Sequence, residues 1–127
     1  VREGTDATIV AYGPLVPVAL AAAEAAVEDG RSIEVIDLRS ISPLDVPTVA
    51  ASVAKTGRLI VAHEAPTFGG MGGELAAAIT ERCFYSLQAP VIRVGGYYMP
   101  YPVSRVEEEY VPDIDRILEA VDRAFDY

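Results

Sequence analysis

The residues best suited to chemistry lie between Arg58 and Ser86, where an apolar run ends in His63, the only histidine, followed by Glu64. An imidazole beside a carboxylate could serve as an acid–base pair or help to hold a metal ion. Neighbouring residues of a strand point to opposite faces, so these two side chains are not expected to address one substrate together. A structural histidine, or one that contributes to a site completed by a neighbouring domain, is the resulting interpretation.

A glycine-rich turn from Gly69 to Gly73 follows this pair and precedes an expected helix. Backbone N–H groups at a helix start attract anions, so the turn could cradle a phosphate group. The G-x-G-x-x-G pattern fails at Leu75, no Gly-Lys-Ser/Thr ending exists, and Glu74 would repel an anion. The alternatives are a free-standing nucleotide- or anion-binding α/β module that uses the Gly69–Gly73 turn, and a tight turn that packs a helix against a strand.

Other catalytic arrangements find little support. Cys83 is the only cysteine and Lys55 the only lysine, and Ser40 and Ser42 lie in a turn without a glycine elbow. Cys83 is expected to be a buried spectator thiol. The net charge of −9 argues against nucleic-acid binding and leaves two alternatives, a basic protein partner or a solvated acidic surface.

Alternating short strands and helices must position these residues. Apolar runs and turn residues predict strands at 6–12, 32–38, 58–63 and 90–95 and helices at 15–29, 46–56, 74–84 and 113–125. Such alternation predicts a three-layer α/β/α domain with a largely parallel sheet. No apolar run reaches the ~20 residues that span a membrane, so a cytoplasmic protein is expected.

The helices carry clear inner faces. In the first helix Leu15, Ala19, Ala22 and Ala26 share one face, and Asp45 is placed to cap the second helix. The last helix is expected to bury an apolar stripe: Ile114, Ile117, Leu118, Val121 and Phe125.

A tyrosine-rich loop follows the fourth strand, from Gly95 to Val103, and holds Tyr97, Tyr98 and Tyr101. Tyrosine combines a large apolar ring with a polar tip, which suits an interface, although loop tyrosines also cover the edge of a core. The sequence leaves both roles open.

Three motifs in order carry a family resemblance: Asp37–Asp45, Val61–Pro66 with the glycine turn, and Cys83–Pro102. The chain, from Gly4 to Tyr127, resembles the C-terminal domain of transketolase-family proteins. It is most similar to β subunits of thiamine-diphosphate-dependent 2-oxo acid dehydrogenases, the branched-chain (2-oxoisovalerate) type first and the pyruvate type next. Many relatives carry an aspartate where this chain has Tyr98.

The resemblance implies a mixed five-strand sheet, whose extra strand is expected to be antiparallel and to lie near 103–110. Residues 1–5 are then expected to be an interdomain linker remnant and residues 6–127 the domain. The parent enzyme would decarboxylate a branched-chain 2-oxo acid or pyruvate oxidatively and transfer the acyl group to lipoyl groups. Its thiamine diphosphate and Mg²⁺ would be held by the α subunit and by the N-terminal domain of the β subunit. No catalytic, cofactor or metal residue is therefore expected within this chain.

The implied partners are the α subunit and a second β subunit of a heterotetramer, and the subunit-binding domain of the dihydrolipoyl acyltransferase. Neither nucleic acid nor membrane is an expected partner. The acidic C-terminal end is the expected contact for the acyltransferase. The interface candidates are His63, Glu64, Phe68, Tyr97, Tyr98, Tyr101, Asp126 and Tyr127.

Overall fold

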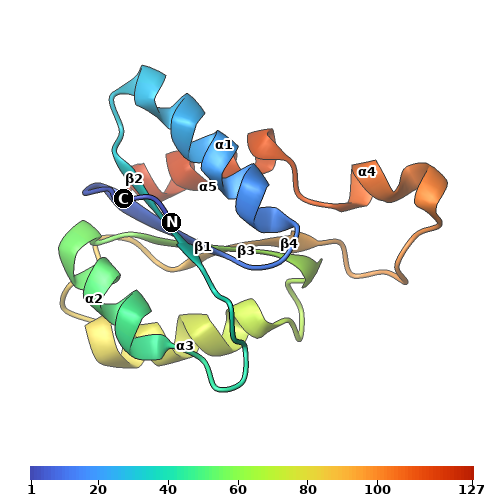
Figure 1. Cartoon of the computed structure of the whole chain (residues 1–127). Coiled ribbons are helices and arrows are strands. Elements are labelled where there is room, and N and C mark those ends of the chain that lie inside the picture. Colours follow the sequence, from blue (N-terminus) through green and yellow to red (C-terminus); the bar gives the residue numbers. More distant parts are fainter.

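The computed structural model describes residues 1–127 and shows one parallel sheet covered by helices on both faces (Figure 1). The sheet has the strand order β2-β1-β3-β4, and all three strand pairs are parallel. Its strands are β1 (Ala7–Ala11), β2 (Ile33–Asp37), β3 (Leu59–Pro66) and β4 (Ile92–Gly96). The α-helices are α1 (Leu15–Ala25), α2 (Val46–Thr56), α3 (Met71–Cys83), α4 (Glu107–Tyr110) and α5 (Ile114–Phe125), and the 3-10 helices are η1 (Ala26–Asp29) and η2 (Ser104–Val106).

The helices form two layers, with α1 and α5 on one face of the sheet and α2 and α3 on the other (Figure 1). Each layer closes its own apolar core, because alternate strand residues point to opposite faces. In β1, for example, Ile9 packs toward α1 and α5, whereas Val10 packs toward α2 and α3. The predicted three-layer α/β/α architecture is confirmed.

Small side chains let α1 lie close to the sheet. Leu15, Ala19, Ala22 and Ala26 are all buried, as the sequence predicted, and Glu24 is exposed. Asp45 caps α2 by accepting a hydrogen bond from the backbone N–H of Thr48 at 3.2 Å. Cys83 is buried, which agrees with the expected spectator thiol.

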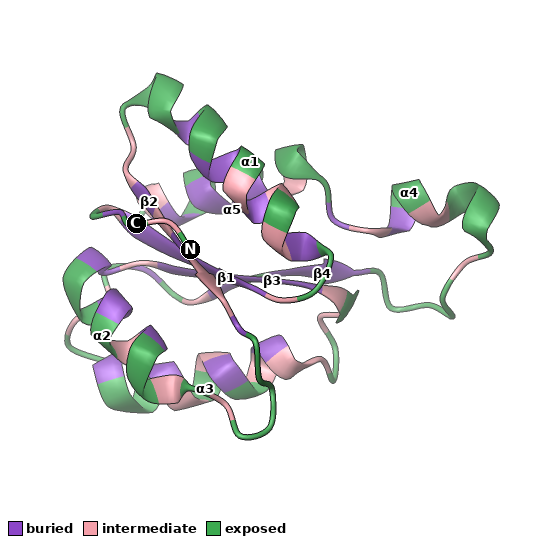
Figure 2. Ribbon diagram, in the orientation of Figure 1, coloured by how far each residue is buried: buried purple, intermediate pink, exposed green.

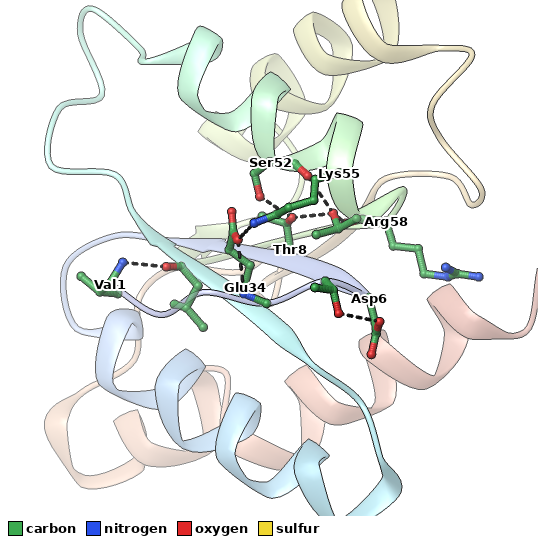
Figure 3. A network of polar contacts seen from close by, with 11 residues as sticks. Val1, Asp6, Thr8, Glu34, Ser52, Lys55 and Arg58 are labelled. Carbon is green, nitrogen blue, oxygen red and sulfur yellow. Dashed lines mark hydrogen bonds and ion pairs between the residues drawn. The ribbon is translucent and has the colours of Figure 1, made fainter.

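A buried hydroxyl network ties α2 to the sheet (Figure 3). The Thr8 hydroxyl lies 2.7 Å from the hydroxyls of both Ser52 and Thr56. Beside it Lys55 forms an ion pair with Glu34 of β2, and Glu34 also accepts a hydrogen bond from the backbone N–H of Gly4. Each buried polar group of this cluster is thereby satisfied, which is the condition for burying it without loss of stability.

The prediction of a fifth strand near 103–110 was wrong. This segment forms η2 and α4 instead, and it projects beyond the carboxyl end of β4, to the side of the helical layers (Figure 1). The sheet has four strands, and its one antiparallel addition is an isolated bridge between Arg2 and Val35 of β2. The acidic run Glu107–Glu109 forms the first turn of α4, where carboxylates suit the positive helix end.

Two helix boundaries also differ from the prediction. Helix α3 begins at Met71, three residues earlier than expected, so that Gly72 and Gly73 belong to its first turn. Helix α1 ends at Ala25, and the chain continues as η1 to Asp29. In α5, Ile114 is 39% exposed, whereas the prediction placed it in the buried apolar stripe. None of the helices is both long and apolar enough to cross a membrane.

Candidate functional site

The carboxyl ends of β3 and β4 hold two adjacent groups of residues that the sequence singled out. We call His63 with the glycines packed on it, Gly70, Gly72 and Gly95, the histidine core. We call the exposed side chains beside it, Phe68, Tyr97, Tyr98, Met99 and Tyr101, the aromatic surface. Ligands of open α/β sheets commonly bind at this end of the strands, so both groups lie where a site is expected.

The His63 side chain is fully buried and points toward α3. Its Nδ1 lies 2.8 Å from the carbonyl oxygen of Ala65. Because a carbonyl can only accept, Nδ1 carries a proton, and in the neutral ring Nε2 is the nitrogen without one. Nε2 has no hydrogen-bond partner.

The surroundings of His63 favour this neutral form. Burial lowers the pKa of His63, the hydrogen bond to Ala65 works against this, and the charge of Arg93 lowers the pKa further. The Tyr12 ring stacks against the imidazole with a centroid separation of 6.0 Å. The ring is thus held as a neutral, buried group.

Glycines enclose the imidazole of His63 because no larger residue fits. A Cβ atom added to Gly72 would lie 2.5 Å from Nε2, and one added to Gly70 would lie 2.8 Å from Cε1. From β4, a Cβ atom on Gly95 would lie 3.1 Å from Cε1. The glycine-rich turn therefore brings the start of α3 into contact with the histidine ring, which is the packing role weighed for it from the sequence.

The aromatic surface is exposed, in contrast to the histidine core. Phe68 and Tyr98 pack edge to face at 4.8 Å, yet their side chains are 72% and 79% exposed. Tyr101 contacts the buried ring of Tyr110 at 5.0 Å. Figure 2 shows that the segment around α4, which continues this surface, is largely exposed.

Contacts at Tyr101 and at Tyr97 hold the tyrosine loop in place. The Tyr101 hydroxyl lies within hydrogen-bonding distance of the carboxylates of Glu64, at 2.8 Å, and of Glu107. Hydrogen bonds to the Glu107 and Glu64 carboxylates raise the pKa of Tyr101. The Arg116 guanidinium lies 4.8 Å above the Tyr97 ring. Exposed rings on a fixed loop can bind a partner with little loss of conformational entropy.

The acidic C-terminal end lies at the opposite end of the sheet. Asp126 and Tyr127 are exposed there. The preceding Phe125 ring is held between the guanidinium groups of Arg31 and Arg58, at 4.6 and 4.4 Å. Arg58 also donates to the carbonyl oxygen of Ala124 at 2.9 Å, so the end of α5 is fixed to the start of β3.

The structure thus divides the candidates predicted from the sequence. Five of them gather at the carboxyl end of the sheet around the exposed loop: Glu64, Phe68, Tyr97, Tyr98 and Tyr101. His63 adjoins them but is buried, and Asp126 and Tyr127 form a separate exposed end. No group of three or more His, Cys, Asp or Glu side chains is placed to hold a metal ion.

Two features of this end were missed from the sequence. Met99 extends the aromatic surface and is 51% exposed, which its place among three tyrosines could have suggested. A polar hollow beside Tyr97 is lined by three arginines, from β4 and α5. Its signal was the spacing of Arg116, Glu119 and Arg123, which places them on one face of a helix.

Comparisons with known proteins agree with one another. A family model described as "Transketolase, C-terminal domain" matches residues 1–117. The chain is 58% identical over 127 residues to a pyruvate dehydrogenase E1 component subunit beta from Leifsonia xyli subsp. xyli, a match that covers the whole chain and 38% of that protein. It is 50% identical over 123 residues to a 3-methyl-2-oxobutanoate dehydrogenase subunit beta from Mycobacterium tuberculosis, covering 96% of the chain and 35% of that protein.

A solved structure shares the fold. It is titled a split gene transketolase in an inactive β4 tetramer, and it superimposes with a TM-score of 0.80 at 30% identity. The match covers 98% of this chain and 40% of that one. The chain thus spans roughly two fifths or less of the length of each of these relatives.

Proposed function

This chain belongs to the transketolase C-terminal domain family, and from that premise we propose that it is the assembly and docking domain of the β subunit of a 2-oxo acid dehydrogenase. The relatives named above as β subunits of pyruvate and 3-methyl-2-oxobutanoate dehydrogenases support this proposal. The parent protein would act on pyruvate or on a branched-chain 2-oxo acid. It would pair with an α subunit and with a second β subunit.

The observation that carries the proposal is the exposure of the aromatic surface. Tyr98 leaves most of its side chain uncovered on the loop after β4, which is held by Glu64, Glu107 and Arg116. Phe68, in the turn between β3 and α3, packs on Tyr98 and is also mostly exposed. Tyrosine, methionine and phenylalanine are enriched in protein interfaces, and rigid aromatic anchors are frequent hot spots. The related solved chain is titled a β4 tetramer, which supports a second copy of this chain as a partner, and we propose the aromatic surface as the contact.

The residues of this chain do not fit a thiamine diphosphate and Mg²⁺ site. No cluster of His, Cys, Asp or Glu side chains is placed to hold a metal. The His63 ring packs against Gly70 and Gly72 at the start of α3. We propose that other parts of the parent enzyme bind the cofactor and that this chain contributes to assembly and docking.

Self-association of the 127-residue chain tests the assembly role. Sedimentation velocity should show a dimer that forms with increasing protein concentration. Tyr98→Ser should weaken this dimer by about tenfold or more, since truncation of a hot-spot residue costs ~2 kcal/mol. Tyr85→Ser is the matched control, because Tyr85 is fully exposed at the end of α3 and lies outside the aromatic surface.

A wild-type chain that stays monomeric at every concentration would contradict this self-association. So would equal weakening of the dimer by Tyr85→Ser and Tyr98→Ser, because a general loss of surface apolarity would then explain both results.

Docking of the acyltransferase is proposed at the C-terminal end. Asp126 and Tyr127 are exposed, and the Arg31–Phe125–Arg58 stack fixes the helix that leads to them. Calorimetric titration of the chain with the basic subunit-binding domain should show binding that weakens as salt screens the charges. Asp126→Asn should weaken it more than Glu81→Gln, a change of an exposed carboxylate on α3. Binding that ignores both salt and Asp126→Asn would refute this docking site.

A further inference from the structure

A polar hollow lies between α5 and the carboxyl end of β4, beside the aromatic surface. Its volume is about 310 Å³. The side chains and backbone that matter to its chemistry are Arg93, Gly95, Tyr97, Arg116, Glu119 and Arg123. Arg93 comes from β4, whereas Arg116, Glu119 and Arg123 come from one face of α5. Three guanidinium groups thus line one small space in a chain whose net charge is −9.

The positive charges of these arginines are not neutralised within the chain. The four ion pairs of the structure involve Arg2, Arg31, Arg39 and Lys55, and none involves an arginine of the hollow. The hollow therefore combines three unpaired guanidinium groups with the single carboxylate of Glu119. Gathering like charges in one place is unfavourable unless an anion joins them.

Two of the three guanidinium groups are already fixed by contacts to the backbone. Arg93 donates to the carbonyl oxygen of Thr67 at 2.9 Å. Arg116 donates to the carbonyl oxygens of Gly95 and Tyr110 and packs on the Tyr97 ring. A guanidinium has five N–H donors, so both arginines keep donors that these contacts do not use. Arg123 makes no hydrogen bond or ion pair within the chain and adds a further free group.

We propose that this hollow binds the phosphoryl group of a small phosphate ester. Three positive charges and one carboxylate leave two positive charges, which matches a phosphate monoester with a charge of about −1.5 to −2 at pH 7. Guanidinium groups suit phosphate because their planar donors can bind two oxygens at once. The site is separate from the Gly69–Gly73 turn, whose Gly70 and Gly72 pack against the His63 ring.

Titration of the 127-residue chain with inorganic phosphate and with methyl phosphate tests the site, by calorimetry and by the NMR shifts of the arginine Nε–H groups. Both probes should bind saturably, whereas acetate should bind more weakly because it carries one charge. Arg123→Gln and Arg93→Gln should each weaken phosphate binding by about tenfold or more, since hydrogen bonds to a charged group contribute that much. Arg82→Gln is the matched control, an exposed arginine on α3 that lies outside the hollow.

Glu119→Gln gives a result of opposite sign. Removal of the one carboxylate of the hollow should strengthen phosphate binding a few-fold, as expected for one exposed charge. Absence of saturable phosphate binding would overturn the proposal. Equal weakening by Arg82→Gln and Arg123→Gln, or equal affinity for acetate and phosphate, would also overturn it. Tyr97 and Tyr98 line both the hollow and the aromatic surface, but the two tests stay distinguishable. Dimer formation is measured without phosphate, and phosphate binding is tested with variants that leave both tyrosines in place.

Discussion

The histidine core and the aromatic surface lie side by side at the carboxyl end of the sheet, yet they are built in opposite ways. His63 is fully buried, its Nδ1 is bonded to Ala65, and glycines leave its ring no room to move. Phe68 and Tyr98 are mostly exposed, and the loop that carries Tyr98 is fixed through Tyr101. His63 and its glycines, whose types suggest a catalytic site, thus form a closed packing unit. The residues of the aromatic surface lie in connecting loops and form an exposed surface.

The difference shows that residue type alone does not locate a site. A histidine beside a carboxylate and a glycine turn has the composition of an active site, but its ring has no solvent access. The function proposed for this chain therefore depends on its surfaces. Each experiment below separates an effect on packing, expected at the histidine core, from an effect on binding, expected at the aromatic surface.

The largest effect is expected from Gly72→Ala. The added methyl group would lie 2.5 Å from Nε2 of His63, a buried ring that cannot rotate away. Overpacking of this kind costs about 1–3 kcal/mol of the free energy of unfolding. Urea denaturation measures the loss, and Gly73→Ala is the control because its added Cβ would meet only the end of Arg93 at 3.4 Å. Gly73→Ala should be neutral or slightly stabilising, since alanine favours a helix.

A double-mutant cycle tests whether the cost of Gly72→Ala comes from a steric clash with His63. His63→Ala alone should destabilise the chain by leaving a cavity. In the background of His63→Ala, the Gly72→Ala change should lose most of its cost because the ring is absent. Additive costs of the two substitutions would show that the glycine is needed for another reason.

The second effect concerns the pH dependence of stability. Because burial lowers the pKa of His63 in the folded chain, the unfolded chain binds more protons between that lowered value and about 6.5. The stability that neutral His63 contributes is therefore full above about pH 6.5 and is lost as the pH falls toward the folded-state pKa. Thermal melts at pH 7.5 and 5.5 should show a larger fall for the wild type than for His63→Gln.

The charged and titratable groups around His63 are Arg93 on β4, Tyr12 after β1, and Glu64. Burial raises the pKa of Tyr12, which therefore stays neutral across this pH range. The difference between the two proteins isolates the imidazole, because the other neighbours are the same in both. Identical slopes in wild type and His63→Gln would mean that His63 is not held neutral.

A smaller effect is expected from Tyr101→Phe. The change removes the hydroxyl between Glu64 and Glu107 and leaves the ring in place against Tyr110. The loss of this link should loosen α4, so the amide of Val111, which donates to the carbonyl of Glu107 at 3.1 Å, should exchange its hydrogen faster. Tyr85→Phe should leave that rate unchanged. An unchanged rate in Tyr101→Phe would show that the hydroxyl does not hold the loop.

The smallest effect on stability is expected from Tyr98→Ser. Its ring is 79% exposed and touches mainly Phe68, so the free energy of unfolding should change by no more than about 0.5 kcal/mol. The same urea denaturation used for Gly72→Ala measures it, on a dilute sample in which the dimer is dissociated. A loss as large as that of Gly72→Ala would make Tyr98 a core residue and remove the contrast between the two regions.

Much of the fold could be predicted because local signals agree with it. The apolar run of β1, the bounds of α2 and the cap at Asp45 follow directly from residue type and spacing. The segment at 103–110 was mistaken for a strand because the expectation rested on a resemblance, whereas its three glutamates favour a helix start. The early start of α3 was missed because glycine normally ends a helix, and only contact with the His63 ring explains glycines in its first turn.

The site was less predictable, because burial depends on distant residues. Sequence alone could not show that Gly95, more than 30 positions after His63, closes over its ring. The tyrosine loop was recognised as a surface feature. Its contact with Tyr110 could not be predicted, because that contact depends on the position of α4. The arginine hollow combines β4 with α5, and only the half that lies on α5 left a pattern in the sequence.

Hydrogen exchange of the chain at low and at high protein concentration tests the central claim most directly, because it reads both regions in one experiment. We expect self-association to protect backbone amides of residues 97–106 and of Phe68, and to leave the amides of 59–66 unchanged. Protection confined to the histidine core, with the tyrosine loop exchanging equally fast at both concentrations, would contradict the claim that this chain acts through its aromatic surface.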